Sequence, residues 1–227
     1  MNTKGLLDQL LASGQAMLNQ NSTTGGIAGA KPGGFQVSDF SKGALAGGAL
    51  GLLLGHKGVR KMGGGALKYG SAAALGALAF RAYTDWQRQN AQTAPQQMPR
   101  TLDRLPPQEV ELHSRGVLQA LVAAAKADGH IDERERSLIQ EELAKLADDA
   151  ETRAWLQQEI AKPLDPANVA AAATTPELAA EMYLASLLAA DQQSFMERAY
   201  LDELARQLKL PPTLKETLER QVLSPGV

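Results

Sequence analysis

Apolar residues recur at helical spacing along most of the second half of the chain. Over residues 108–126, Val110, Leu118, Leu121 and Val122 fall near the helical period of about 3.6 residues. Apolar stripes of the same period follow over residues 132–146, 149–161, 176–190, 194–208 and 213–222. No alternating strand pattern occurs between residues 106 and 227. The pattern therefore predicts an all-α domain over residues 108–227, a bundle of about seven helices joined by short turns.

Helix start signals set the expected boundaries within this domain. Asp165 and Thr175 each precede a proline, and this arrangement favours helices that begin at about residues 166 and 176. Three further pairs have the spacing of a capping box, in which two side chains satisfy backbone N–H groups at a helix start: Asp132 with Glu135, Ser194 with Glu197, and Thr213 with Glu216. Helices are therefore also expected to start at these three places.

The first 18 residues predict a short amphipathic helix. Leu6, Leu7, Leu10 and Leu11 lie on one helical stripe, and Asp8 is a lone acid on the polar side. A stripe of this kind either lies on a membrane or packs on a partner, and the sequence leaves both interpretations open. The segment lacks the continuous apolar region of a secretory signal peptide.

Two segments have the composition of linkers. Residues 19–42 are rich in Gly, Ser, Thr and Asn and show no sustained period, which is typical of a flexible linker. Residues 87–107 are rich in Gln and Pro and lack an apolar face. These segments isolate residues 43–86 and predict a domain boundary near residue 107.

Glycines repeat at four-residue spacing between the two linkers. Gly43, Gly47, Gly51 and Gly55 form a glycine zipper in the run GALAGGALGLLLG. Each glycine disfavours a water-exposed helix by roughly 1 kcal/mol relative to Ala, so four together require about 4 kcal/mol of compensation. A bilayer enforces helix, and a ridge of small residues lets a second helix approach closely. We therefore expect residues 43–86 to contact membrane lipids as helices, with the glycine ridge pairing within one chain or between copies in a homo-oligomer.

The lengths of the apolar runs leave the membrane topology open. At about 1.5 Å per residue, the runs at residues 43–55 and 69–80 reach roughly 20 Å, less than the ~30 Å hydrocarbon thickness. Either residues 66–86 cross a locally thinned bilayer, or the two runs form a hairpin that dips into one leaflet. Small residues of the second run, including Ser71 and Gly76, are then expected to face the glycine ridge. A third interpretation is a low-complexity segment that lacks structure or packs on the C-terminal domain.

Charge is distributed unevenly along the chain. Residues 1–105 carry 11 Lys+Arg and 4 Asp+Glu, whereas residues 106–227 carry 12 and 21. A basic half favours anionic lipid or nucleic acid as a partner. Aromatic residues make up only 4% of the chain and form no stacking platform for bases, so we expect lipid and not nucleic acid. The absence of cysteine excludes disulfides, thiolate nucleophiles and Cys-ligated zinc.

Two stretches of the C-terminal domain resemble a known family. The runs AAAKADGHIDERERSLIQEEL and LLAADQQSFMERAYLDELARQLKLPP are similar to the TerB-like domain associated with bacterial tellurite resistance. The glycine zipper, GHKGVRK and RAYTDW extend the resemblance to the YebE-like DUF533 family of inner-membrane proteins of unknown function. The resemblance implies an all-helical domain with two pseudo-symmetric halves.

The resemblance also implies a cluster of acidic residues proposed to hold a divalent metal. Carried onto this sequence, the candidate ligands are Asp128, Asp132, Glu135, Asp191 and Glu197. Gln192 and Gln193 replace an Asp-Gly pair of the family pattern, which lowers the charge of the second half. No EF-hand loop pattern is present. Capping of helix starts is the competing interpretation of these acids, because each already has a local backbone partner available.

No catalytic constellation emerges from the sequence. The HExxH and GxSxG patterns are absent, and His113 is expected to be a lone surface histidine. The sequence therefore predicts a non-enzymatic membrane-associated protein of the bacterial inner membrane. Its domain at residues 108–227 would face the cytoplasm and either bind a protein partner or sense a divalent ion, in envelope or metal stress. The alternative is a soluble divalent-metal-binding helical domain with a flexible N-terminal tether.

Overall fold

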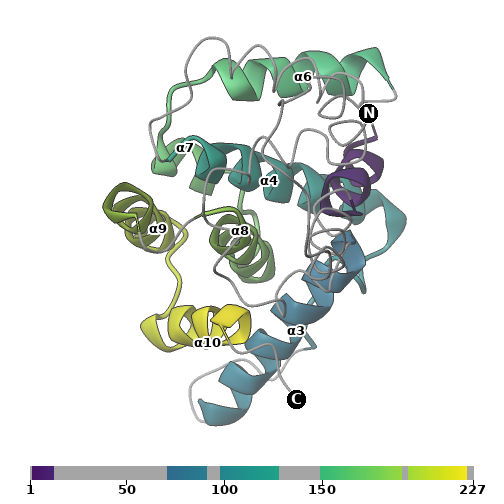
Figure 1. Ribbon diagram of the computed structural model, residues 1–227. Helices are drawn as coiled ribbons and strands as arrows, with labels where there is room; N and C mark the ends of the chain where they lie inside the picture. The colour runs from purple at the N-terminus through teal and green to yellow at the C-terminus, as the bar shows by residue number, and fades with distance from the viewer. Residues whose placement is uncertain (1, 13–70, 91–97, 128–148, 191–193, 224–227) are drawn as a thin grey trace, which may run out of the picture.

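The computed structural model describes residues 2–12, 71–90, 98–127, 149–190 and 194–223 (Figure 1). We call these residues together the helical domain. Within it, eight helices and no strand occur, which confirms the predicted all-α class. They are an N-terminal helix of residues 3–12, α3 (Ala72–Gln89), α4 (Pro107–Ala125), α6 (Ala150–Ala161), α7 (Pro166–Ala170), α8 (Pro176–Ala189), α9 (Phe195–Gln207) and α10 (Pro212–Leu223).

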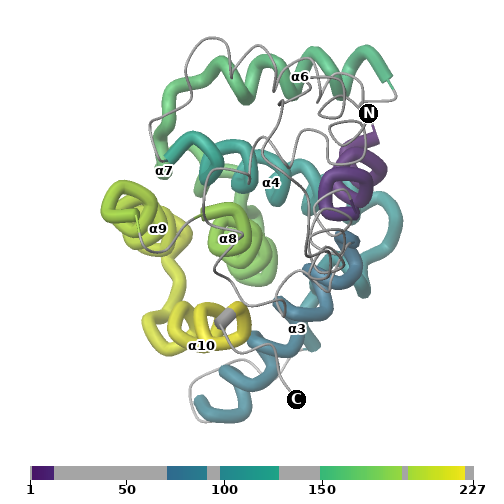
Figure 2. The backbone as a smooth tube through the Cα atoms, in the orientation of Figure 1, coloured from purple at the N-terminus to yellow at the C-terminus, as the bar shows by residue number. Residues whose placement is uncertain are grey.

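Helix α8 forms the centre of the helical domain. Every residue from Leu178 to Leu187 is buried, so the helix is covered on all sides. It packs against α3, α4, α9 and α10, which surround it in Figure 2. Apolar residues occur on every side of α8, so the helix has no polar face to turn toward water and is buried all round. The two polar residues inside this run, Glu181 and Ser186, must therefore find partners within the protein.

One hydrophobic core includes residues from both halves of the sequence. Leu6 and Leu10 of the N-terminal helix, Leu75 and Leu78 of α3, and Leu118 of α4 belong to the same buried cluster. The core thus extends across the boundary predicted near residue 107. The described part of the segment predicted to contact lipid, residues 71–86, packs on α8 and α10.

The segment predicted as a second linker, residues 87–107, is partly helical and partly buried in the structure. Helix α3 continues to Gln89, and α4 begins at Pro107. Between them, Thr101 and Leu102 are buried in the helical domain. Gln- and Pro-rich composition correctly indicates that residues 98–106 are not helical, but it carries no information on whether their side chains are buried. Among the described residues, no helix combines the length and apolarity that crossing a bilayer requires.

Most of the predicted caps are confirmed. Asp165 accepts a hydrogen bond from the Ala167 N–H at 2.9 Å, and Thr175 accepts one from the Leu178 N–H at 3.1 Å. Ser194 accepts a hydrogen bond from the N–H of the third residue of α9 at 3.4 Å.

The predicted cap at Thr213 is wrong. A cap at Thr213 would make Leu214 the first helical residue, but α10 begins two residues earlier, at Pro212. The carbonyl of Pro211 accepts hydrogen bonds from the N–H groups of Leu214 and Lys215. The Thr213 hydroxyl instead accepts a hydrogen bond from the indole N–H of Trp86 at 2.9 Å. Proline fits the first helical position because its missing N–H has no acceptor to find there.

Candidate functional site

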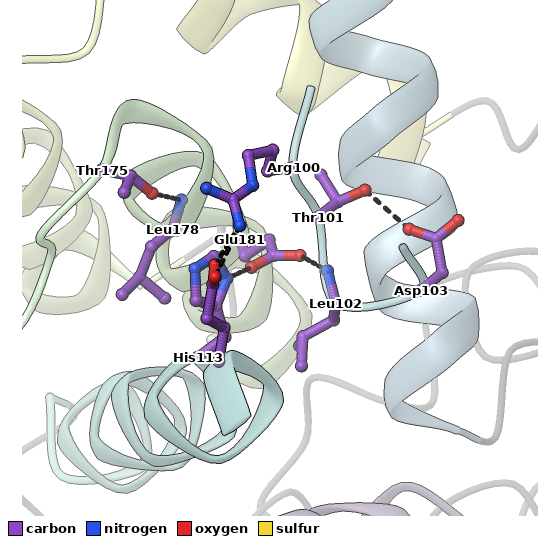
Figure 3. Close-up of polar contacts among 9 residues, drawn as sticks. Arg100, Thr101, Leu102, Asp103, His113, Thr175, Leu178 and Glu181 are labelled. Atoms are coloured by element: carbon purple, nitrogen blue, oxygen red, sulfur yellow. Dashed lines mark hydrogen bonds and ion pairs between the residues drawn. The ribbon is translucent and has the colours of Figure 1, made fainter. Parts of the chain in front are cut away.

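A buried carboxylate joins three segments in the centre of the helical domain (Figure 3). Glu181 of α8 has no exposed surface, and its Oε2 lies 2.6 Å from Nδ1 of His113 on α4. Its Oε1 accepts a hydrogen bond of 2.5 Å from the backbone N–H of Leu102. The carboxylate therefore holds α4 and the segment between α3 and α4 against α8. We call Glu181, His113 and the Leu102 N–H the carboxylate node.

The electrostatics of this node are dominated by burial. Removal from water raises the pKa of Glu181 above its ordinary value because the charged form loses hydration. The hydrogen bond and the charge of His113 oppose this shift, as does the Leu102 N–H. Asp103 adds a further increase through charge repulsion.

His113 was expected at the surface, and this prediction is wrong. It is 4% exposed, because position 113 lies on the side of α4 that faces α8. Its partner Glu181 lies 68 residues further along the chain. The pairing could not be found from local sequence spacing, and the available signal was an acid within the mostly apolar run of α8.

A glycine allows the Leu102 backbone to reach the node. A Cβ atom at Gly76 of α3 would lie 2.7 Å from the backbone N of Asp103 and 2.9 Å from Cβ of Leu102. Gly76 was expected to face the glycine ridge, but in the structure its small size admits the chain at residues 102–103. This segment is further fixed by a hydrogen bond of 2.6 Å from the Thr101 hydroxyl to Asp103 and by an ion pair between Arg100 and Glu109.

The carboxylate node contains an acid and a histidine, as an acid–base pair does, but a substrate cannot reach them. A general acid or base must come within hydrogen-bond distance of a reacting group. Glu181 is fully buried and His113 is 4% exposed, so neither can meet a substrate without opening of the packed helices. We assign the node a structural role, the joining of α4, α8 and residues 101–103.

A second group of polar contacts attaches the N-terminal helix. Asn2 accepts a hydrogen bond of 2.9 Å from the Gly5 N–H and thereby caps the helix. The Glu111 carboxylate of α4 accepts hydrogen bonds from the Thr3 N–H at 2.7 Å, the Thr3 hydroxyl at 2.7 Å and the Lys4 N–H at 3.5 Å. A carboxylate at this end also interacts favourably with the helix dipole.

The same end of the helix contacts α6. The backbone N–H of Asn2 donates to Oδ2 of Asp149 and to the hydroxyl of Thr152, at 3.0 Å in each case. Asp149 is itself the N-cap of α6, where it accepts a hydrogen bond of 2.7 Å from the Thr152 N–H. These hydrogen bonds, led by that from Thr152, lower the pKa of Asp149.

The N-terminal helix in turn caps α3. Asp8 accepts a hydrogen bond of 2.9 Å from the backbone N–H of Ala72, the first residue of α3, and a hydrogen bond of 3.2 Å from the Ala74 N–H reaches Ser71. Lys4 pairs with Asp8 at 2.6 Å. Asp8 and Ala72 lie 64 positions apart in the sequence, so this contact brings together the two ends of the intervening chain.

Most of the predicted site residues lie outside the described residues. This holds for the candidate metal ligands Asp128, Asp132, Glu135 and Asp191, and for Gly43, Gly47, Gly51 and Gly55 of the glycine zipper. Glu197 is described and is buried in the first turn of α9, where its N–H donates to Ser194. Within the helical domain, no group of three or more His, Asp or Glu side chains is arranged to hold a metal. The metal cluster stays a prediction.

Comparison with known proteins relates the chain to proteins without an assigned function. The model of the family described as "Protein of unknown function (DUF533)" matches residues 39–222. The "Uncharacterized protein in ampR 5'region" of Yersinia enterocolitica is 33% identical over 106 residues, which cover 47% of this chain and 76% of the relative. No solved structure matches the chain.

Proposed function

Because the chain belongs to the DUF533 family, whose function is unknown, we propose its function from its own residues. It is a non-enzymatic protein of the bacterial inner membrane. The helical domain faces the cytoplasm and holds residues 13–70 at the lipid surface. The resemblance to TerB-like domains supports a further role of this domain in partner binding or divalent-ion sensing during envelope or metal stress.

The observation that carries this proposal is the contact between Asp8 and Ala72. The hydrogen bond of 2.9 Å, together with the shared core, holds the two helices that flank residues 13–70 in one folded body. The helical domain thus has the geometry of a holder for the intervening chain.

Residues 13–70 have the composition that an anionic membrane attracts. They carry six Lys and Arg residues and a single acid, Asp39, although the whole chain has a net charge of −2. Each basic residue near an anionic leaflet contributes about 1 kcal/mol to binding. The glycine zipper at residues 43–55 lies within the same segment, whereas the described residues 71–86 pack on protein. Lipid contact is therefore assigned to residues 13–70.

Carbonate extraction of bacterial membranes tests the proposal. The full-length protein is expected to stay in the pellet after washing at high pH, which removes proteins held by charge alone. Complete recovery in the supernatant would contradict insertion of any part of the chain.

Vesicle binding tests the charge contribution separately. The triple variant Lys57→Gln, Arg60→Gln, Lys61→Gln removes three positive charges from residues 13–70. At about 1 kcal/mol per charge, affinity for vesicles rich in phosphatidylglycerol is expected to fall roughly 150-fold at low salt. Binding to neutral phosphatidylcholine vesicles should change little.

A matched control removes the same charge from the helical domain. Arg81, Arg198 and Lys209 have exposed side chains, and their triple replacement by Gln lowers the net charge equally. This control is expected to bind anionic vesicles within a few-fold of the wild type. Equal losses in both triple variants would show that net charge, and not residues 13–70, directs the protein to lipid.

A further inference from the structure

The contact between the N-terminal helix and α3 also constrains membrane topology, an inference that rests on the proposed function. The Ala72 N–H reaches the Asp8 side chain at 2.9 Å. Residue 12, the last described residue of the N-terminal helix, lies four positions after Asp8, an axial distance of about 6 Å. Residue 71 directly precedes Ala72, at about 3.8 Å between Cα atoms. Residues 12 and 71, which flank residues 13–70, are thus held within roughly 15 Å of each other.

This separation is too small for the two ends to lie on opposite sides of a bilayer. The hydrocarbon region alone is ~30 Å thick. The two ends also belong to one folded body, because Leu6, Leu7 and Leu10 share the buried core with Leu75 and Leu78 of α3. A chain that crossed the membrane once between residues 12 and 71 would have to separate these helices.

We propose that this protein meets the membrane from one side only. Residues 2–12 and the described residues between 71 and 223 stay together on that side, and any part of residues 13–70 that enters the bilayer returns to the face from which it came. A single crossing by residues 66–86 is excluded in this arrangement, since residues 72–86 form part of α3 within the helical domain.

The remaining apolar run supports shallow entry. With residues 71–80 packed on protein, the main apolar run left in residues 13–70 is GALAGGALGLLLG. Its 13 residues reach about 20 Å as a helix, which is shorter than the ~30 Å needed to cross. Entry into one leaflet is therefore the geometry that agrees with both the run length and the shared side of its ends.

Single-cysteine labelling tests this topology, because the chain has no native cysteine. Ala12→Cys and Ala199→Cys place thiols at exposed positions on the N-terminal helix and on α9. A membrane-impermeant maleimide is applied to spheroplasts and, in parallel, to inverted membrane vesicles. Both thiols are expected to be protected in spheroplasts and labelled in inverted vesicles. Labelling of the two thiols from opposite sides would overturn the inference and leave the proposed membrane association intact.

Cross-linking in the membrane tests the shared attachment directly. A bismaleimide with a span of about 15 Å should join Ala12→Cys to Ala73→Cys, since both positions are exposed next to the Asp8 contact. Trypsin cleaves at several Lys residues between the two positions, so mass spectrometry detects the link as a joined pair of peptides. The pair Ala12→Cys and Ala199→Cys is the control and should not be joined, because α9 lies far from the N-terminal helix (Figure 1).

The outcomes separate the two proposals. Same-side labelling with the link between positions 12 and 73 supports the inference. Same-side labelling without that link contradicts it, because the ends are then not held together in the membrane. Complete carbonate extraction of the protein contradicts the proposed function itself, whatever the labelling pattern.

Discussion

Removal of the Glu181 carboxylate is the sharpest test of the carboxylate node. In the variant Glu181→Ala, the Leu102 N–H and the His113 imidazole both stay buried and lose their shared partner. Loss of a partner costs about 1–3 kcal/mol for each buried polar group, and breaking a buried acid–histidine contact falls near 3–5 kcal/mol in total. Because small domains are stable by only about 5–15 kcal/mol, this single change removes a large share of the free energy of unfolding.

The variant Glu181→Gln separates hydrogen bonding from charge. The amide oxygen can still accept from the Leu102 N–H, and the amide NH₂ can donate to Nδ1 of a neutral His113. We therefore expect a loss below about 1.5 kcal/mol, in the range of a single hydrogen bond. The matched control is Glu216→Ala on the exposed face of α10, which should change stability by less than about 0.5 kcal/mol.

Urea unfolding of the full-length chain, followed by far-UV circular dichroism, measures these differences. The comparison requires that the slope of the unfolding free energy against urea concentration is the same in each variant, because a shift of the midpoint then reports a change in stability alone. A loss below about 1 kcal/mol for Glu181→Ala would refute the reasoning, since it would mean that the node is not closed in solution. Equal losses for the Ala and Gln variants would show that charge, and not hydrogen bonding, holds the three segments.

Three further outcomes are expected. Burial raises the pKa of Glu181 in the folded protein above its ordinary value of 4.5, so the folded protein binds the carboxyl proton more tightly than the unfolded chain does. The stability that this proton binding contributes is fully present below pH 4.5 and is lost as pH rises through the folded pKa. The stability of the wild type relative to Glu181→Gln should therefore fall with rising pH, by at most about 1.4 kcal/mol per pH unit in urea midpoints measured between pH 4.5 and 7. Gly76→Ala should lower the melting temperature through a clash with backbone, whereas Gly116→Ala, whose Cβ would meet only side-chain ends at 3.2 Å and 3.3 Å, should be tolerated better. Asp8→Ala should destabilise the protein by about 1 kcal/mol and speed hydrogen exchange at the Ala72 amide, and unchanged exchange there would contradict the cap.

Local signals in the sequence predicted the helices and most of their starts. Asp165 and Thr175 act as caps because the interaction involves residues only two or three positions apart, and a short pattern contains all of it. Thr213 has the spacing of a capping box with Glu216, yet the proline before it occupies the first helical position, so α10 starts two residues before the position that the capping box predicts. Where two local signals competed, spacing alone did not rank them.

Contacts between residues far apart in the chain could not be predicted from the sequence. His113 and Glu181 are 68 positions apart, and no periodicity links a histidine on one helix to an acid on another. Gly76 was correctly recognised as a position of close approach, but its neighbour is the chain at Leu102 and Asp103 instead of a second glycine-rich helix. A small residue predicts that something packs closely and does not say what.

The N-terminal helix shows why an apolar stripe cannot by itself distinguish protein from lipid. Its four leucines are at most 6% exposed, and burial of each contributes about 1.5–3 kcal/mol. Lipid chains are as apolar as a leucine side chain, so insertion into a bilayer would recover an energy of the same order. The hydrogen bonds that Glu111 and Asp8 make to backbone N–H groups have no equivalent in hydrocarbon. These polar contacts, and not the leucines alone, therefore favour the helical domain over lipid as the surroundings of this helix, and the proposed lipid contact is assigned to the chain that follows it.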